Sequence, residues 1–195
     1  MKKFLAIIIL SLCFIIPSQA DDIRDFQIEG MSIGDSLLDY FSKEEIESRS
    51  KFYPNSKKFV RFYNAGKESK IYDTFDFHYK NDDPRYLISN ITAIIFYREN
   101  IKDCFKKKNE IVSELVEMFK DSKHYEDKKQ KHLADKTGKS FIYQYFFRLD
   151  SGDSAKVSCF DWSKEVRKTK GWLDHLRVGI YDEEYKLWLQ NEAFK

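Results

Sequence analysis

The segment 71–80 alternates between two kinds of side chain, and this alternation is the strongest constraint on the fold. Phe75 and Phe77 occupy alternate positions, and Asp76 and His78 follow each of them. Successive side chains of a β-strand point to opposite faces of the sheet. The segment therefore predicts a strand whose Phe75 face lies on a hydrophobic core, with the Asp76 face directed away from it.

Other segments extend this pattern into a whole fold. Strand-like runs occur at 58–64, 86–97, 140–149, 155–162 and 172–181, and helical spacing of apolar residues indicates helices at 32–49, at about 100–120 and from Asp182 onward. The order predicts an α+β fold, with helices packed on one face of an antiparallel, aromatic-rich sheet and the other face open. It also allows an α-β-β-β tandem repeat.

The first twenty residues are typical of an export signal. Two lysines precede an apolar stretch, and Ser18-Gln19-Ala20 supplies the small residues that a signal peptidase requires. We expect cleavage before Asp21 and a periplasmic or secreted bacterial protein, with a single domain over 21–195 and no stable membrane span after cleavage. The alternative is an uncleaved N-terminal helix that anchors the chain in the membrane.

The charge of the chain argues against nucleic-acid binding. Lys and Arg number 34 and Asp and Glu 32; loss of Lys2 and Lys3 with the signal leaves 32 of each, a net charge of zero. A nucleic-acid-binding protein needs a basic surplus. The densest basic stretch lies in 121–139, where acidic residues interrupt it, and we expect a mobile, charged loop there. The expected partner is a protein or a small-molecule ligand.

Cys104 and Cys159 are the two cysteines that remain after signal cleavage. In an oxidising compartment they are expected to form a disulfide. Their spacing does not match a metal site, and we expect neither a metal ion nor a cofactor. A catalytic thiol with His78 or His175 as its base is the less favoured reading.

Residues 28–38, Ile-Glu-Gly-Met-Ser-Ile-Gly-Asp-Ser-Leu-Leu, resemble a helix-entry motif of small periplasmic modules. These are the SmpA/OmlA-like outer-membrane assembly proteins and the β-lactamase-inhibitor-like folds. In them a Gly-Pro turn follows the helix, whereas here 42–45 continue the helical pattern. Over its whole length the chain resembles exported proteins of AT-rich marine alphaproteobacteria. The resemblance implies a secreted α+β module and supplies no active site.

Candidate functional residues lie on the polar faces of three predicted strands. They are Tyr72, Asp76 and His78 in the first, Gln144 and Arg148 in the second, and His175, Arg177 and Tyr181 in the third. If these faces coincide, the sheet presents a surface for a ligand or partner, with both histidines exposed on the side away from the helices. No catalytic motif is present, and no catalytic residue is assigned. The sequence favours a non-catalytic binding or protein-interaction module; the alternative is a small hydrolase or isomerase with a His/Asp site around His78 or His175.

Overall fold

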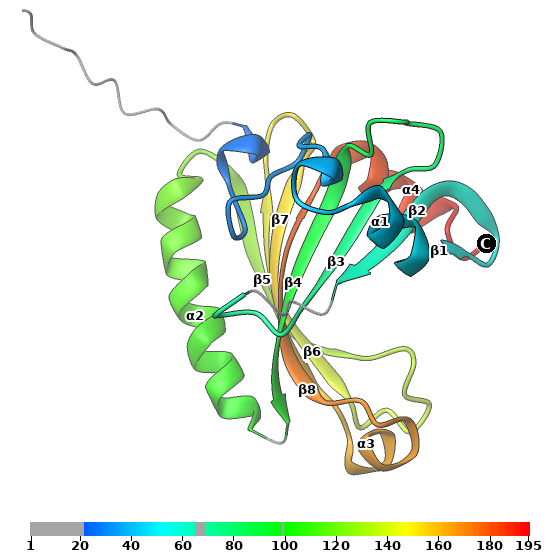
Figure 1. Cartoon of the computed structure of the whole chain (residues 1–195). Coiled ribbons are helices and arrows are strands. Elements are labelled where there is room, and N and C mark those ends of the chain that lie inside the picture. The colour runs from blue at the N-terminus through cyan, green and yellow to red at the C-terminus, as the bar shows by residue number, and fades with distance from the viewer. Residues whose placement is uncertain (1–21, 65–68, 99) are drawn as a thin grey trace, which may run out of the picture.

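The computed structural model describes residues 22–64, 69–98 and 100–195, so the predicted export signal lies outside the described residues. Eight strands form one antiparallel sheet in the order β1-β2-β3-β4-β8-β7-β6-β5 (Figure 1). The strands are β1 (Ser50–Tyr53), β2 (Ser56–Asn64), β3 (Thr74–Lys80), β4 (Ile88–Arg98), β5 (Lys123–Lys131), β6 (Phe141–Arg148), β7 (Ser154–Asp161) and β8 (Asp174–Tyr181). The described helices are α1 (Lys43–Arg49), α2 (Ile101–Met118), α3 (Lys164–Lys170) and α4 (Glu183–Asn191), with short 3₁₀ turns at Ile23–Asp25 and Leu37–Asp39. The predicted α+β class is confirmed.

The sheet consists of two meanders of four consecutive strands, joined where β4 pairs with β8. A helix follows each meander, α2 after β4 and α4 after β8. The predicted α-β-β-β repeat has three strands in each unit, whereas each half of the sheet has four, and α3 separates β7 from β8 in the second half. The two helices lie on opposite faces, because α2 packs with the core cluster of Phe77 whereas Tyr185 of α4 packs with Phe59.

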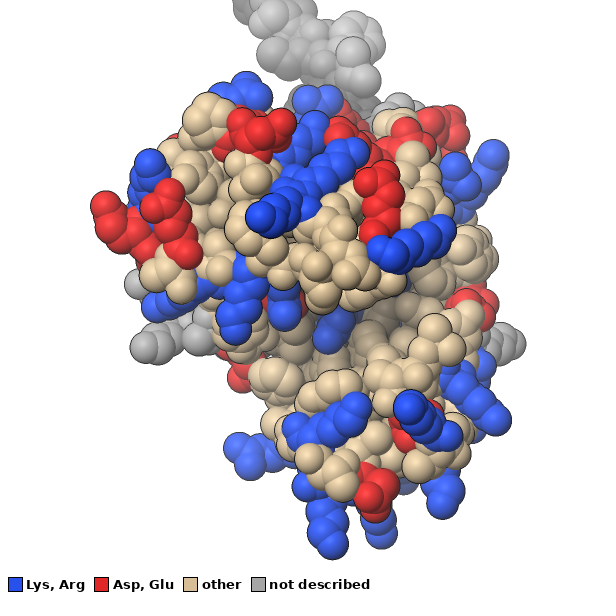
Figure 2. Space-filling model, turned by 90° about the vertical axis from the view of Figure 1, so that its right-hand side faces the viewer, with Lys and Arg blue, Asp and Glu red and all other residues tan. Residues whose placement is uncertain are grey.

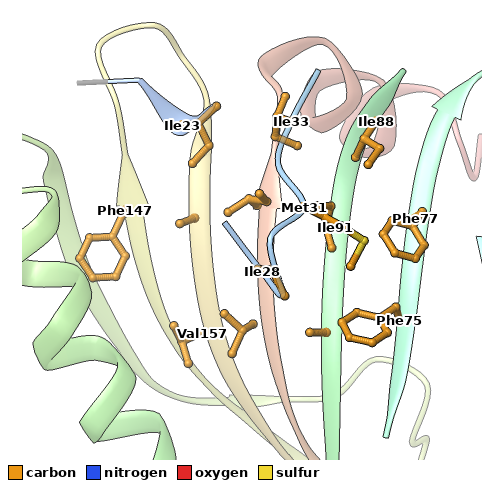
Figure 3. Packing of buried hydrophobic residues seen from close by; sticks show 14 of the residues in the cluster. Ile23, Ile28, Met31, Ile33, Phe75, Phe77, Ile88, Ile91, Phe147 and Val157 are labelled. Carbon is orange, nitrogen blue, oxygen red and sulfur yellow. The ribbon is translucent and has the colours of Figure 1, made fainter. Parts of the chain in front are cut away.

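One face of the sheet, called here the core face, carries the main hydrophobic core. α2 contacts β4, β7 and β8 on this face, and α1 contacts β2. Residues 22–42 cover the space between them as a largely irregular segment. Figure 3 shows its residues Ile23, Ile28, Met31 and Ile33 over the strands that carry Phe75, Phe77, Ile91 and Val157.

The first correction concerns the helix predicted at 32–49, which is not continuous in the structure. The structure has a short 3₁₀ turn there and then α1, which begins only after Ser42. The backbone N–H groups of Gly34 and Leu37 donate to the carbonyl oxygens of Ile88 and Tyr86, at 2.9 and 3.1 Å. These bonds tie the segment to the start of β4 and replace the bonds that a continuous helix would make.

The second correction concerns the mobile loop predicted within 121–139. Residues Lys123–Lys131 form β5, which pairs with β6 from Lys123↔Arg148 to Lys131↔Phe141. β5 is an edge strand, and charged residues at a sheet edge hinder pairing with other chains. Its composition therefore suits an exposed strand, although it lacks the apolar alternation by which strands are usually detected.

The predicted disulfide is present between Cys104 of α2 and Cys159 of β7. Their Cα atoms are 6.0 Å apart, and both residues are fully buried. The bond fixes α2 to the core face. Among the helices of the described residues, none combines the length and apolar character needed to cross a membrane.

The opposite face of the sheet, called here the second face, is covered at both ends. At one end Trp188 and Tyr185 of α4 pack on Phe59, and the indole N–H of Trp188 donates to Ser56 Oγ at 2.9 Å. At the other end Val166 of α3 packs with Trp162. The expected open face is thus narrowed to the region between α4 and α3.

Candidate functional site

The strand register places nearly all of the predicted candidate residues on the second face. Asn90 lies between His78 and Tyr181 as the cross-strand partner of both. Ser158 is likewise the cross-strand partner of both Arg177 and Gln144. By the same alternation, the residues on this face are Asp76, His78, Gln144, Arg148, His175, Arg177 and Tyr181. The three predicted faces therefore coincide.

Tyr72 does not share this face. It precedes β3, and its ring packs against Phe75 of the core face at a centroid distance of 5.6 Å. Alternation fails for Tyr72 because the strand begins only at Thr74.

A groove crosses the second face between α4 and α3, and we call it the sheet groove. It consists of two hollows of about 550 and 540 Å³, here the α4 half and the α3 half, which share Arg61, Asp76 and Arg177 in their walls. Figure 2 shows this side of the molecule hollowed between two lobes, with Lys and Arg side chains at its margins. Gln144 and Arg148 lie on the same face, farther along the sheet, and do not line the groove.

His78 lies in the α4 half with only 5% of its surface exposed, so the prediction of an exposed histidine is wrong here. The amide of Asn90 donates to Ile180 O at 2.7 Å, which directs its Oδ1 to His78 Nδ1 at 2.8 Å. Nδ1–H of His78 therefore donates, and Nε2 accepts from the Tyr53 hydroxyl at 2.9 Å. Burial lowers the pKa of His78 to about 3, which keeps the ring neutral.

His175 lies in the α3 half and is also 5% exposed, which corrects the second expected exposed histidine. Its Nδ1–H donates to Leu173 O at 2.7 Å, so Nε2 is free to accept from Arg177 Nε at 3.1 Å. The ring stacks on Phe160 with centroids 4.5 Å apart. Burial, followed by the charge of Arg177, lowers the pKa of His175 to about 3.

Asp76 is engaged by Arg61 at the boundary between the two halves. Arg61 Nη2 donates to both carboxylate oxygens, at 2.6 and 2.8 Å, and Nε donates to Oδ1 at 2.9 Å. Since Asp76 and His78 each have these other partners, they do not form the His/Asp pair of the alternative hypothesis.

Cations outnumber anions in the groove walls. Lys51, Arg61, Lys156 and Arg177 line it, whereas Asp76 is the one carboxylate among its lining residues. The excess is local, because the chain without its first twenty residues has no net charge. The Lys156 ammonium lies 5.2 Å from the centroid of the Tyr181 ring, which also lines the α4 half.

Aromatic side chains form much of the remaining wall, and most of them are not among the residues predicted from the sequence. They include Tyr53, Tyr185 and Phe194 in the α4 half, and Tyr63, Phe96, Trp162 and Trp172 in the α3 half. Trp162 could have been found, because it continues the alternation of Ser158 and Phe160. Tyr53 and Trp172 reach the groove through tertiary packing that no local pattern indicates.

Comparison with known proteins gives no family for this fold and site: no protein-family model, no curated protein and no solved structure matches the chain. Within the described ranges, no three His, Cys, Asp or Glu side chains gather in a way that could hold a metal ion.

Proposed function

We propose that this chain is an exported, non-catalytic binding protein and that the sheet groove receives a small-molecule ligand. The observation that carries the proposal is the groove itself. Its two adjoining hollows each fall within the size range of small-molecule sites, and aromatic walls surround a few fixed polar groups. Strands of the sheet supply much of the lining, and α4 and the segment after α3 supply other parts of it.

The hydrogen bonds of the two histidines favour binding over catalysis. A general base is commonly oriented by a carboxylate or another acceptor and presents its second nitrogen to the substrate. In His78 both ring nitrogens are occupied, by Asn90 and Tyr53. In His175 they are occupied by Leu173 and Arg177. Neither ring has a free nitrogen for proton transfer.

Export is part of the proposal and rests on the residues before Asp21 and on the disulfide. Structural disulfides persist in oxidising compartments, which agrees with the buried Cys104–Cys159 bond. Mass spectrometry of the chain expressed in a bacterium should find a periplasmic or secreted form that begins at Asp21. Retention of Met1 in a membrane fraction would instead support the anchored alternative.

Ligand binding can be tested by screening a chemically diverse fragment library against ¹⁵N-labelled protein. We expect fragments that shift amide resonances of β3, β4 and β8 beneath the groove. The variant Thr92→Phe fills the floor of the α4 half, since Thr92 lies in its wall, and should abolish binding of the fragments that occupy that half. Ser113→Phe, on the exposed surface of α2, is the matched control and should leave binding unchanged.

Two results would contradict the proposal. The first is a library in which no fragment shifts the groove resonances. The second is an equal loss of binding in both variants. If Thr92→Phe does not fold, Lys156→Phe provides the same test from the half-buried rim of the groove.

A further inference from the structure

We infer that the sheet groove recognises an organic oxyanion, a carboxylate or phosphate on an apolar body, and that Arg177 is the residue that holds the charged group. The inference rests on the proposed function and specifies the ligand class. Its evidence is the charge balance at the middle of the groove, the fixed position of Arg177, and buried donors that lack partners.

The charge balance at the centre leaves one guanidinium in surplus. Asp76 sits there with two arginines, and both of its oxygens accept from Arg61. This bidentate pair neutralises the carboxylate. Arg177 forms no ion pair with any carboxylate in the part of the chain that the structure describes. Arg177 is half-buried and has no carboxylate in ion-pair contact among the described residues, so a ligand anion can complete its charge balance.

Arg177 is held in one orientation. Its Nε–H donates to His175, and its guanidinium carbon lies over the Phe160 ring at 4.6 Å. The hydrogen bond to His175 engages Nε, and Phe160 covers one face of the guanidinium plane. The two terminal nitrogens make no hydrogen bond to the described residues, and they form the fork that matches a carboxylate or a phosphate in a bidentate manner. Arg177 is half-buried, and this partial removal from water lowers the pKa of its guanidinium.

Three buried polar groups on the second face also lack hydrogen-bond partners among the described residues. The Thr74 hydroxyl and the Trp162 indole nitrogen are buried without a partner among the described residues, and both side chains line the α3 half. Ser158 pairs with Arg177 in the register of β7 and β8, and its hydroxyl has no partner either. The indole N–H can only donate and the two hydroxyls can donate, so a ligand with acceptor atoms, such as the oxygens of an oxyanion, matches these groups.

The walls of the α3 half define the rest of the ligand. Trp162 and Trp172 lie with ring centroids 4.6 Å apart, and Phe96 stands on the opposite side of His175 from Phe160 in the strand register. Aromatic walls favour a flat apolar group through burial and offset stacking. We therefore expect the apolar body of the ligand in the α3 half and its charged group at Arg177.

The experiment measures binding of three matched probes by calorimetry: 2-naphthoate, 2-naphthyl phosphate and the neutral 2-naphthalenemethanol. We expect at least one of the two anions to bind roughly tenfold or more tightly than the alcohol, a difference of about 1.4 kcal/mol. Inorganic phosphate is added as a competitor. If it displaces the probe, the site binds the free anion as well as the organic ester or acid.

The test variant is Arg177→Gln, and the matched control is Arg148→Gln on the same face outside the groove. Arg177→Gln should remove the preference for the anion, whereas Arg148→Gln should keep it. Arg177→Lys retains the charge without the fork and should lose part of the preference; it also keeps the test valid if the Gln variant does not fold. Trp162→Phe keeps the aromatic ring without the N–H group and should weaken anion binding.

Equal binding of the neutral and anionic probes would overturn this inference and leave the proposed function standing. Equal losses in the Arg177→Gln and Arg148→Gln variants would overturn it as well, because the effect would then be one of overall charge. Failure of both the fragment screen and the three probes would overturn the proposed function together with this inference.

Discussion

Arg177 donates through Nε to Nε2 of His175 at 3.1 Å, which requires that the histidine ring be neutral. A protonated ring would present an N–H to the guanidinium in place of a lone pair. The Leu173 carbonyl, which accepts from Nδ1 at 2.7 Å, selects the tautomer that leaves Nε2 unprotonated. The position of the arginine in the groove thus depends on the protonation state of its neighbour.

The first prediction is that the free energy of unfolding decreases as the pH is lowered below about 6.5. The pKa of His78 and of His175 is lowered from 6.5 to about 3 in the folded protein, with burial as the main cause. Between these values the unfolded chain binds protons that the folded chain does not. The stabilisation is therefore complete above 6.5 and is lost toward pH 3, by up to about 1.4 kcal/mol per pH unit for each histidine.

Urea unfolding at several pH values between 7 and 5 measures this slope. His78→Gln should reduce it by the contribution of one histidine, whatever the variant costs in stability at pH 7. Ser113→Gln, at an exposed position and with no titratable group involved, should leave the slope unchanged. An equal slope in the wild type and in the His78→Gln variant would contradict the prediction.

The second prediction concerns the disulfide. Cys104 and Cys159 are separated by 55 positions, and closing a loop of this length stabilises the folded state by about 4 kcal/mol in the chain-entropy model. The double variant Cys104→Ala, Cys159→Ala should unfold at a correspondingly lower denaturant concentration. Wild-type protein treated with a reductant should match it, and the reductant should have no effect on the double variant. A midpoint that does not move would show that α2 docks without the bond.

The third prediction is that Gly179 and Tyr181 are energetically coupled. A Cβ on Gly179 would lie 2.5 Å from the Tyr181 hydroxyl oxygen and 2.9 Å from two ring carbons, so the ring would have to leave its place over β8. Gly179→Ala should therefore destabilise the wild type, by about 1–3 kcal/mol for overpacking, and cost much less when Tyr181 is also replaced by Ala. A double-mutant cycle measures the coupling.

Gly171→Ala is the control for this cycle. Gly171 has φ +67° with nothing within 4 Å of the added Cβ, so its cost arises from the backbone alone. It should show no coupling to Tyr181→Ala. Additive effects of Gly179→Ala and Tyr181→Ala would contradict the predicted contact.

Alternation was sufficient to predict which residues of β3 and β8 share a face, because strand geometry fixes it locally. It could not predict that His78 is buried. That burial depends on Tyr185 of α4, whose ring centroid is 4.6 Å from the His78 ring although the residues are far apart in sequence. The same limit applies to Arg61, which lies in a correctly predicted strand. Its place in the groove depends on the ion pair that it forms with Asp76 of the neighbouring strand β3, and the sequence of β2 alone does not indicate that contact.

The last prediction is that the negative charge of Asp76 lowers the affinity of the groove for anions. Asp76 is nearly buried, with 9% of its side chain exposed, whereas 45% of the Arg61 side chain is exposed. Asp76→Asn removes the only negative charge among the groove-lining residues and releases Arg61 from its bidentate pair. The variant should lose about 1–2 kcal/mol of stability, since an ion pair is replaced by hydrogen bonds from Arg61 to a neutral amide and solvent screens the exposed partner. It should bind 2-naphthoate more tightly than the wild type does and leave the affinity for 2-naphthalenemethanol unchanged. Calorimetry with both probes measures the two affinities.

Asp150→Asn makes the same change of net charge at an exposed position in the β6–β7 turn, outside the groove. If both variants raise the affinity for the anion equally, the gain comes from overall charge, and Asp76 has no special place in the groove.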